Sequence, residues 1–396
     1  MPSKSSMICP APSHSIVITS DGFMAPCCIY PLKNHSFKDL NIKEKKSDDL
    51  YKTFSHLSKT MDQGGIPLEC KVCFKKESEG LISRRLSILK NFKKNHNPET
   101  YKRFHAEISF SNHCNLNCAM CNAHFSDKWT QTHKLFSNSK SDSLKKYHKD
   151  FIQTTHSHFI PKEEVVSLAK LLDGVQFIEL LGGEPLLYPH LDTFLSTLSR
   201  NPSPPELVLP TTNLTVLNKK IINTLKDSKL RFTFTISLDG TNETYDYIRG
   251  FPFKKVNENI DALLSQDFTQ SVFINPTFGF LNSLEYPNLF NWIEGKKSKR
   301  KIKVKAQQFL RAEEPTSFIA LPENIRDEHI EILKKFSLPP DNQKELQTVI
   351  HHIQAFPKGS KENFKEAFEF IQVFNQHRKL DILEINPSLK YLTQYS

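Results

Sequence analysis

The chain has 396 residues, which is enough for two or three domains, and 38% of them are hydrophobic. Charged residues make up 24% of the chain, a proportion typical of a folded globular protein and not of a disordered one. The net charge of +10 permits an anionic partner such as a nucleic acid but does not require one.

Residues 1–98 form the first predicted domain, a small cysteine-rich module. It opens without the apolar segment of a signal peptide, so we expect a cytoplasmic protein. Five of the eight cysteines lie in this module, and the other three follow soon after, so that none occurs beyond residue 121. Clustered cysteines without a secretion signal favour metal or iron–sulfur ligation over a framework of disulfides.

Residues 99–322 form the second predicted domain, in which strand-like and helix-like segments alternate. This alternation predicts an α/β fold with parallel strands, and six units instead of eight predict a partial, open TIM-like (βα)6 barrel. Ligands of such folds bind at the C-terminal ends of the strands. The predicted strands are 105–111, 176–182, 206–212, 231–238, 271–278 and 303–310, and the predicted helices are 161–173, 189–200, 216–227, 253–266 and 286–295.

The second predicted domain also contains a polar insert, and a third predicted domain follows the second one. Residues 124–160, with five histidines, predict a solvated loop with short helices, or alternatively a substrate lid. The most apolar stretch, 165–183, contains Lys170 and Asp173, and a membrane span needs about 20 largely apolar residues, so we expect no membrane partner. Residues 323–396 show helical patterns at 323–336, 343–355 and 361–378, which predict a helical C-terminal region.

The strongest motif is CNLNCAMC, residues 114–121, directly after the first strand of the predicted barrel. Its three thiols, on Cys114, Cys118 and Cys121, can hold three corners of a 4Fe–4S cluster as thiolates and leave the fourth iron open. A structural zinc site is the alternative, and it needs a fourth ligand such as His113 or His124.

With this spacing, C-x3-C-x2-C, the segment resembles the radical S-adenosylmethionine (radical SAM) superfamily. The resemblance implies that the open iron binds the amino and carboxylate groups of SAM. One electron from the reduced catalytic 4Fe–4S cluster then cleaves SAM to a 5′-deoxyadenosyl radical, which abstracts hydrogen from a substrate. The family often has an aromatic residue before the third cysteine, whereas this chain has Met120, a departure that leaves cluster ligation intact.

Further motifs after successive strands match elements with which this family binds SAM. The GGEP element at 182–185 implies that Glu184 contacts the amino group of SAM. The resemblance also implies that Ser237 and Arg249 bind the carboxylate of SAM. Without the resemblance, these motifs are a tight turn, a helix cap at 212–213 and an Asp-Gly turn at 239–240. The residues implied to bind SAM are Gly182, Gly183, Glu184, Thr212, Asn213, Ser237, Asp239, Arg249 and Asn282.

The N-terminal cysteines form a second predicted metal site. Cys9, Gly22 and Cys27 form the pattern C-x12-G-x4-C, and Cys70 and Cys73 form C-x2-C. Four thiolates suffice for a closed 4Fe–4S cluster or for zinc. The first spacing resembles the opening of SPASM and twitch auxiliary-cluster domains, which implies a second 4Fe–4S cluster, with Cys28 as the alternative to Cys27. In most of that family this module follows the barrel, whereas here it precedes it.

The resemblance implies a radical SAM enzyme that modifies a peptide or protein by oxidation, crosslinking or epimerisation, with flavodoxin or ferredoxin as electron donor. A small molecule or RNA is the alternative substrate, and nucleic acid has weak support because the lysines are scattered apart from one basic run at 296–305. A rival of another class is a non-catalytic zinc-binding scaffold protein, which would bind zinc in place of iron and have no affinity for SAM.

Overall fold

A computed structural model of the chain describes residues 8–19, 22–31, 47–79, 82–142, 144–145, 148–149, 160–296, 302–304, 310–311, 315–355 and 357–395. The chain divides into two compact units. Unit 1 comprises residues 1–111, 157–210 and 218–232, and unit 2 comprises residues 112–156, 211–217 and 233–396. The predicted division at 1–98, 99–322 and 323–396 stays a prediction.

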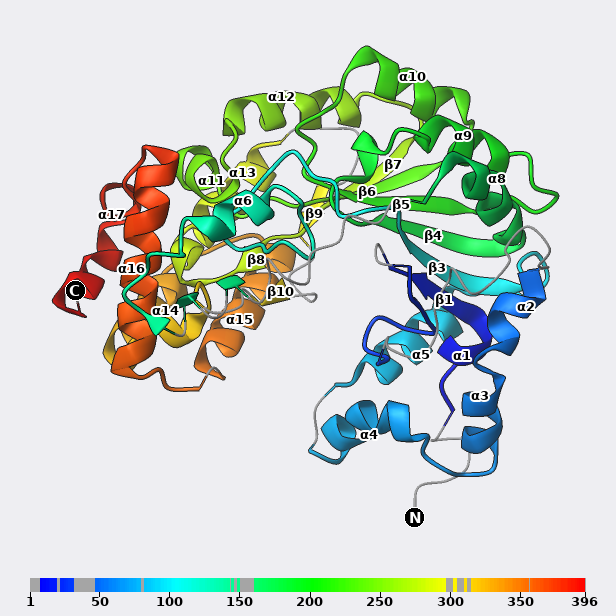
Figure 1. Cartoon of the computed structure of the whole chain (residues 1–396), viewed down its shortest axis with the longest axis horizontal. Helices are drawn as coiled ribbons and strands as arrows, with labels where there is room; N and C mark the ends of the chain where they lie inside the picture. The colour runs from blue at the N-terminus through cyan, green and yellow to red at the C-terminus, as the bar shows by residue number, and fades with distance from the viewer. Residues whose placement is uncertain are drawn as a thin grey trace. The chain divides into compact units, whose positions relative to one another are not determined.

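Parallel strands form the centre of unit 1 (Figure 1). They are β1 (Ser15–Ile18), β3 (Arg103–Ser109), β4 (Val175–Leu181) and β5 (Leu207–Thr212), in that order, with β2 (Met24–Ala25) antiparallel to β1. Burial alternates along β3, where Phe104, Ala106 and Ile108 give the strand one apolar face. The α/β class with a mostly parallel sheet is confirmed.

The first strand of unit 1 joins the N-terminal segment to the sheet. Val17 of β1 lies opposite Glu107 of β3, so the cysteine-rich segment extends a sheet that the sequence pattern assigns to later residues alone. The helices of unit 1 are α1 (Ala11–His14), α2 (Ser47–Lys52), α3 (Ser55–Asp62), η3 (Leu68–Cys70), α4 (Lys71–Ser78), α5 (Arg84–Asn95), α8 (Lys162–Leu171), η4 (Pro185–Leu187), α9 (Leu191–Leu198) and α10 (Lys219–Asp227).

Unit 2 contains the later strands of the alternating pattern. Strands β6 (Phe232–Ile236), β7 (Thr269–Ile274) and β9 (Ile302–Val304) lie in that order, and β8 (Thr277–Phe278) pairs with β10 (Leu310–Arg311). Every residue of β6 is buried, as in parallel strands covered on both faces. The helices among these strands are α6 (Trp129–Lys134), α11 (Asn242–Arg249), α12 (Phe253–Leu264), η5 (Phe280–Asn282), α13 (Tyr286–Gly295) and η7 (Phe318–Ala320).

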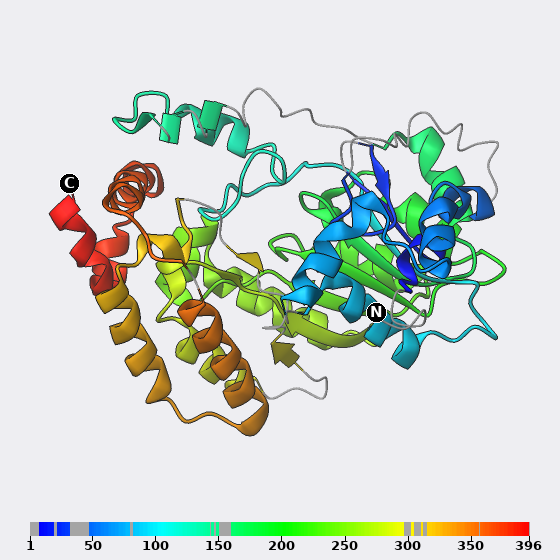
Figure 2. The ribbon, with the colours of Figure 1, turned by 90° about the horizontal axis from the view of Figure 1, so that it is seen from below.

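The predicted helical C-terminal region is confirmed. Helices α14 (Glu323–Lys334) and α15 (Pro340–Gln354) form a hairpin, followed by α16 (Lys361–Arg378), α17 (Ile382–Ile385) and η8 (Pro387–Tyr395) (Figure 2). Ser360 begins α16 with a reciprocal capping box to Asn363. Within the described residues, no helix has both the length and the hydropathy that a bilayer span requires. The predicted strand 303–310 is tested only in part, because 305–309 lie outside the described residues.

Candidate active site

The three cysteines of the C-x3-C-x2-C motif lie together in unit 2. Cys114 and Cys118, which are 7% and 8% exposed, share a buried cluster with Leu116, and Cys121 packs against it. Burial, together with the thiols of Cys118 and Cys114, raises the pKa of the Cys121 thiol well above its ordinary value. A metal centre counteracts this effect because it stabilises the thiolate form.

The donor set fits a cluster held by three thiolates. All eight cysteines lie in described residues, and none of them forms a disulfide bond. Within those residues, no three His, Cys, Asp or Glu side chains have the arrangement of a finished metal site. The fit therefore rests on the chemistry of three neighbouring thiols in one loop, which is the donor type that iron–sulfur clusters require.

Nitrogen donors surround the sulfur atoms. Arg249 Nη1 lies 3.5 Å from Cys118 Sγ, and Asn213 Nδ2 lies 3.7 Å from Cys114 Sγ. The backbone N–H of Leu116 donates to Cys114 Sγ at 3.5 Å. Such hydrogen bonds stabilise negative charge on sulfur and tune a bound cluster.

Residues distant in sequence fix the backbone of the cysteine loop. Asp127 Oδ1 accepts the N–H of Cys114 at 3.0 Å, and Trp129 Nε1 donates to the carbonyl of Cys118 at 2.9 Å. Arg378 Nη2 donates to the carbonyl of Asn117 at 2.7 Å, and Nη1 donates to Asn117 Oδ1 at 2.8 Å. Sequence reasoning missed all three side chains, because none belongs to a spaced motif.

Of the solvated loop with short helices that the sequence predicts at 124–160, a short helix is confirmed as α6, whereas full solvation is wrong for the described part. Trp129 and His133 are each 1% exposed, and His148 is 2% exposed. These three rings pack on one another, and the Phe136 ring stacks on His148 with 3.8 Å between centroids. The tryptophan was the available signal, since a large apolar ring in a polar segment usually finds a buried place. His156 and His158 of this segment lie outside the described residues.

A buried ion pair lies beside the cysteine loop. Arg249 Nε is 2.6 Å from Asp239 Oδ2, and the other carboxylate oxygen accepts the N–H of Thr277 at 2.7 Å. Burial alone lowers the pKa of Arg249, but the Asp239 carboxylate and the Cys118 thiol outweigh it and raise that pKa above its ordinary value. The guanidinium therefore stays charged, and its five N–H donors exceed the contacts made to Asp239 and Cys118.

The ends of β5 and β6 bring two further candidates together. The N–H of Ser237 donates to the carbonyl of Thr212 at 2.9 Å. Asn213 Oδ1 accepts the N–H of Thr215 at 2.9 Å, so this side chain bridges its own turn and the Cys114 sulfur. Helix α10 is capped by Asn218, so the alternative in which Thr212 and Asn213 cap that helix is wrong.

Asn282 lies behind the Asp239 turn and is completely buried. Its Nδ2 donates to the carbonyl of Asp239 at 2.7 Å and to that of Thr277 at 2.9 Å, while Oδ1 accepts the N–H of Gly279. These bonds show that Asn282 supports the turn that positions Asp239. Its predicted contact with SAM stays a prediction.

The GGEP turn belongs to unit 1 and needs its first glycine. Gly182 has φ of +113°, and a Cβ there would lie 2.4 Å from the carbonyl oxygen of Ser111. The N–H of Gly183 donates to the same oxygen at 2.8 Å. Glu184 is 3% exposed, and its carboxylate accepts the N–H of Leu186 at 3.1 Å. The turn thus packs against the residue that lies three positions before Cys114.

Four of the five N-terminal cysteines surround one pocket in unit 1. Cys9, Cys27, Cys70 and Cys73 all line it, whereas Cys28 is exposed and is not among the lining residues. Burial raises the pKa of the Cys9 thiol to about 11 and those of Cys27 and Cys70 to about 12. The four thiols fit the donor set of a closed cluster or of zinc, and the lining favours Cys27 over Cys28.

The family model of the radical SAM superfamily matches residues 108–293, a segment that contains the cysteine loop and the motifs after it for which the sequence predicts SAM contacts. No curated protein matches the chain. Among solved structures, native anSMEcpe with bound AdoMet and Cp18Cys peptide is similar with a TM-score of 0.38 and 17% identity, over 58% of this chain and 58% of that one.

Two further solved structures are similar at comparable levels. Streptococcus suis SuiB bound to precursor peptide SuiA has a TM-score of 0.37 and 13% identity, over 85% of this chain and 65% of that one. The FeFe-hydrogenase maturase HydG from Carboxydothermus hydrogenoformans has a TM-score of 0.33 and 13% identity, over 82% and 72%. The chain therefore spans less than two thirds of anSMEcpe and of SuiB.

Proposed function

The chain is an enzyme of the radical SAM superfamily, and from that premise we propose that it cleaves SAM reductively and abstracts hydrogen from a peptide or protein. The observation that carries the proposal is the meeting of the cysteine loop with the Asp239–Arg249 ion pair. Arg249 contacts both the Asp239 carboxylate and Cys118 Sγ. A charged guanidinium beside a cluster thiolate suits a cosubstrate that carries a carboxylate.

Each residue of this site has a proposed task. Cys114, Cys118 and Cys121 hold the catalytic cluster, which supplies the electron for SAM cleavage when bound. Arg249 binds the SAM carboxylate, and Asp239 orients its guanidinium through the 2.6 Å ion pair. The remaining proposed SAM contacts are Gly182, Gly183, Glu184 with the amino group, Ser237 with the carboxylate, Thr212 and Asn213 near the ribose, and Asn282 with adenosine.

The peptide substrate and the second cluster are proposed from the N-terminal cysteines. Their spacing resembles SPASM and twitch modules, and four thiols around one pocket support ligation by Cys9, Cys27, Cys70 and Cys73. The auxiliary cluster would accept an electron from the substrate or anchor the substrate. The proposal includes a partial barrel of six βα units and an electron donor such as flavodoxin or ferredoxin.

Cysteine variants test the separate roles of the two sites. In anaerobically reconstituted protein with dithionite, Cys118→Ala should abolish 5′-deoxyadenosine formation, because its thiol is a proposed ligand of the catalytic cluster. Cys70→Ala should lower the iron content yet keep uncoupled SAM cleavage. Cys28→Ala is the matched control and should change neither, since Cys28 is exposed. A deuterated peptide substrate should transfer its label into 5′-deoxyadenosine.

Two outcomes would contradict this assignment. Equal loss of SAM cleavage in Cys118→Ala and Cys70→Ala, with unchanged circular dichroism in both variants, would argue against separate roles. A preparation that binds two zinc ions and forms no 5′-deoxyadenosine would favour the zinc scaffold instead.

A further inference from the structure

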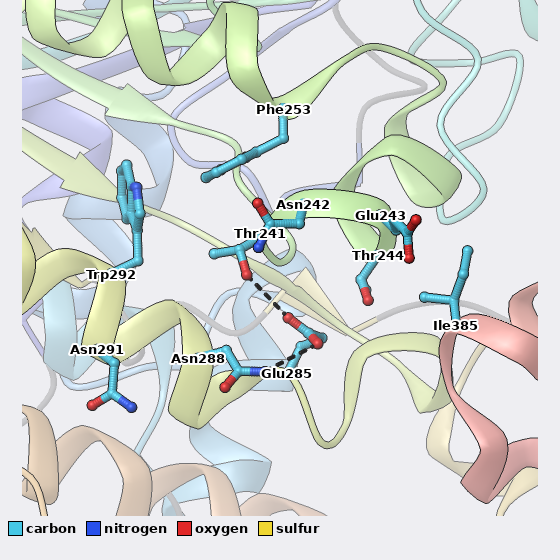
Figure 3. Close-up of a pocket in the computed structure, with 10 residues that line it drawn as sticks. All are labelled: Thr241, Asn242, Glu243, Thr244, Phe253, Glu285, Asn288, Asn291, Trp292 and Ile385. Atoms are coloured by element: carbon cyan, nitrogen blue, oxygen red, sulfur yellow. Dashed lines mark hydrogen bonds between the residues drawn. The ribbon is translucent and has the colours of Figure 1, made fainter.

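Unit 2 contains a cavity of about 440 Å³ that none of the SAM motifs lines. We call it the acidic pocket. Its walls come from the first turn of α11, the start of α12, one face of α13 and Ile385 of α17 (Figure 3). Its volume lies within the ~300–1,000 Å³ range of small-ligand sites. Its lining includes Thr241, Glu243, Phe253, Glu285, Asn291 and Trp292.

The pocket is anionic although the chain as a whole is basic. Glu243 and Glu285 line it, and no Lys or Arg is found among its described lining residues. Glu285 accepts a hydrogen bond from Thr241 Oγ1 at 3.3 Å and one from Asn288 Nδ2 at 3.3 Å (Figure 3). Both donors are neutral, so they fix the carboxylate in place without cancelling its charge. A hollow lined by one sign of charge concentrates ions of the other sign.

Aromatic rings form the apolar part of the wall. Phe253 and Trp292 meet edge to face, with 5.8 Å between ring centroids. Trp292 Nε1 donates to Asn257 Oδ1 at 3.0 Å, which fixes the orientation of the indole. Lys296 Nζ, which pairs with Asp261 Oδ1 at 2.7 Å, lies 5.1 Å from the Trp292 ring centre, so this ring already contacts one cation of the chain itself. Carboxylates beside aromatic rings suit a cation on an alkyl stem.

We propose that the acidic pocket binds the alkylammonium or guanidinium group at the end of a lysine or arginine side chain. The peptide origin of that side chain rests on the proposed function, whereas binding of the cation itself does not. The pocket is linked to the SAM site through α11, because Thr241 precedes that helix and Arg249 ends it. A basic residue held there would anchor the peptide on the helix that presents Arg249.

Calorimetric titration of the full, reconstituted chain tests the proposal with small probes. Nα-acetyl-lysine methylamide and Nα-acetyl-arginine methylamide should bind saturably, and the neutral norleucine analogue should not. Putrescine, a small diamine, tests whether the alkylammonium group comes from a free small molecule and not from a peptide side chain. Equal binding of norleucine and lysine probes would overturn the proposal, and putrescine that binds roughly tenfold tighter than the lysine probe would overturn its peptide origin.

Variants locate the binding in the pocket. Glu285→Gln keeps the hydrogen-bonding shape and should weaken the lysine probe by roughly tenfold, which equals ~1.4 kcal/mol. Glu243→Gln, at an exposed position, should also weaken it. Asn291→Asp adds a carboxylate and should strengthen binding, an effect that misfolding does not produce. Glu258→Gln, on α12 and outside the lining, is the matched control and should leave binding unchanged.

The same samples separate this proposal from the proposed function. Unchanged affinity in Glu285→Gln and Glu243→Gln would overturn the acidic pocket, whatever the SAM assay gives. If no cationic probe binds while 5′-deoxyadenosine forms normally, only the pocket proposal fails. If the probes bind and no 5′-deoxyadenosine forms, the cation site stands and the proposed function fails.

Discussion

Gly182 shows how a single residue determines a turn at the candidate site. Its φ of +113° lies in a region that residues with a side chain rarely adopt, and a Cβ would lie 2.4 Å from the carbonyl oxygen of Ser111. We expect Gly182→Ala to lower the free energy of unfolding by about 1–3 kcal/mol. Urea unfolding measures this, and SAM affinity should fall in the same variant because the turn carries Glu184.

The matched control for this prediction is Gly295→Ala. Gly295 ends α13, its φ is not in the left-handed region, and a Cβ there would meet no atom within 4 Å. Alanine is the better helix former, so stability should stay equal or rise slightly. If both alanine variants unfold at the same urea concentration, the close approach to Ser111 does not constrain the turn.

Residues of the candidate site differ in how far the sequence predicts them. The cluster ligands are predictable, because the sequence spacing alone places three thiols in one loop, those of Cys114, Cys118 and Cys121. Asp127 and Arg378 act through the backbone of that loop, and Arg378 lies 261 residues beyond its partner Asn117. Such contacts depend on tertiary packing, which has no periodic pattern in the sequence.

At the scale of elements, regular periodicity made most of unit 2 predictable. The expected helices 253–266 and 286–295 correspond to α12 at Phe253–Leu264 and α13 at Tyr286–Gly295. Helix α11 was not predicted as a helix, because its eight residues are too few for the 3.6-residue period to stand out. The pairing of β1 with β3 was also missed, because burial patterns identify strands but not their neighbours.

Helix α16 connects the C-terminal region to the cysteine loop through Arg378. The guanidinium donates to Asn117 twice and to the carbonyl of Tyr247 at 2.9 Å. It also lies over the Phe374 ring at 5.1 Å from the ring centre. One planar side chain thus joins the loop of Cys118 to the last turn of α11, so we assign Arg378 as a positioning residue for the catalytic cluster.

The prediction is that Arg378→Gln weakens cluster retention more than it weakens the fold. Reconstituted variant protein should lose iron to a chelator several-fold faster than the parent, because Asn117 of the loop loses two charge-assisted hydrogen bonds, one at its carbonyl and one at its side-chain oxygen. Arg378→Lys should rescue only in part, since lysine lacks the planar fork. Lys365→Gln, exposed on the same helix, is the control. Iron loss at the parental rate in Arg378→Gln would refute the positioning role.

At the scale of the whole molecule, buried and half-buried histidines link stability to pH. Burial is the main cause in every case, and it lowers the pKa of His14, His133 and His329 to about 4 and that of His148 to about 2. These imidazoles stay neutral in the folded protein at pH values where an unfolded chain, with a histidine pKa near 6.5, takes up protons. They lie in both units, so acid should weaken the entire chain.

We therefore expect the free energy of unfolding to fall as the pH decreases below about 6.5. The unfolded state binds more protons there, and each histidine with a lowered pKa contributes up to about 1.4 kcal/mol per pH unit until the pH reaches its own folded pKa. Anaerobic urea unfolding from about pH 7 to about pH 5 measures this slope.

His329→Gln should reduce the slope by the contribution of nearly one bound proton, because His329 is buried against Ser283. His124→Gln, at an exposed position, should leave it unchanged. An equal slope in the parent and His329→Gln would mean that His329 is already protonated in the folded protein, contrary to its burial.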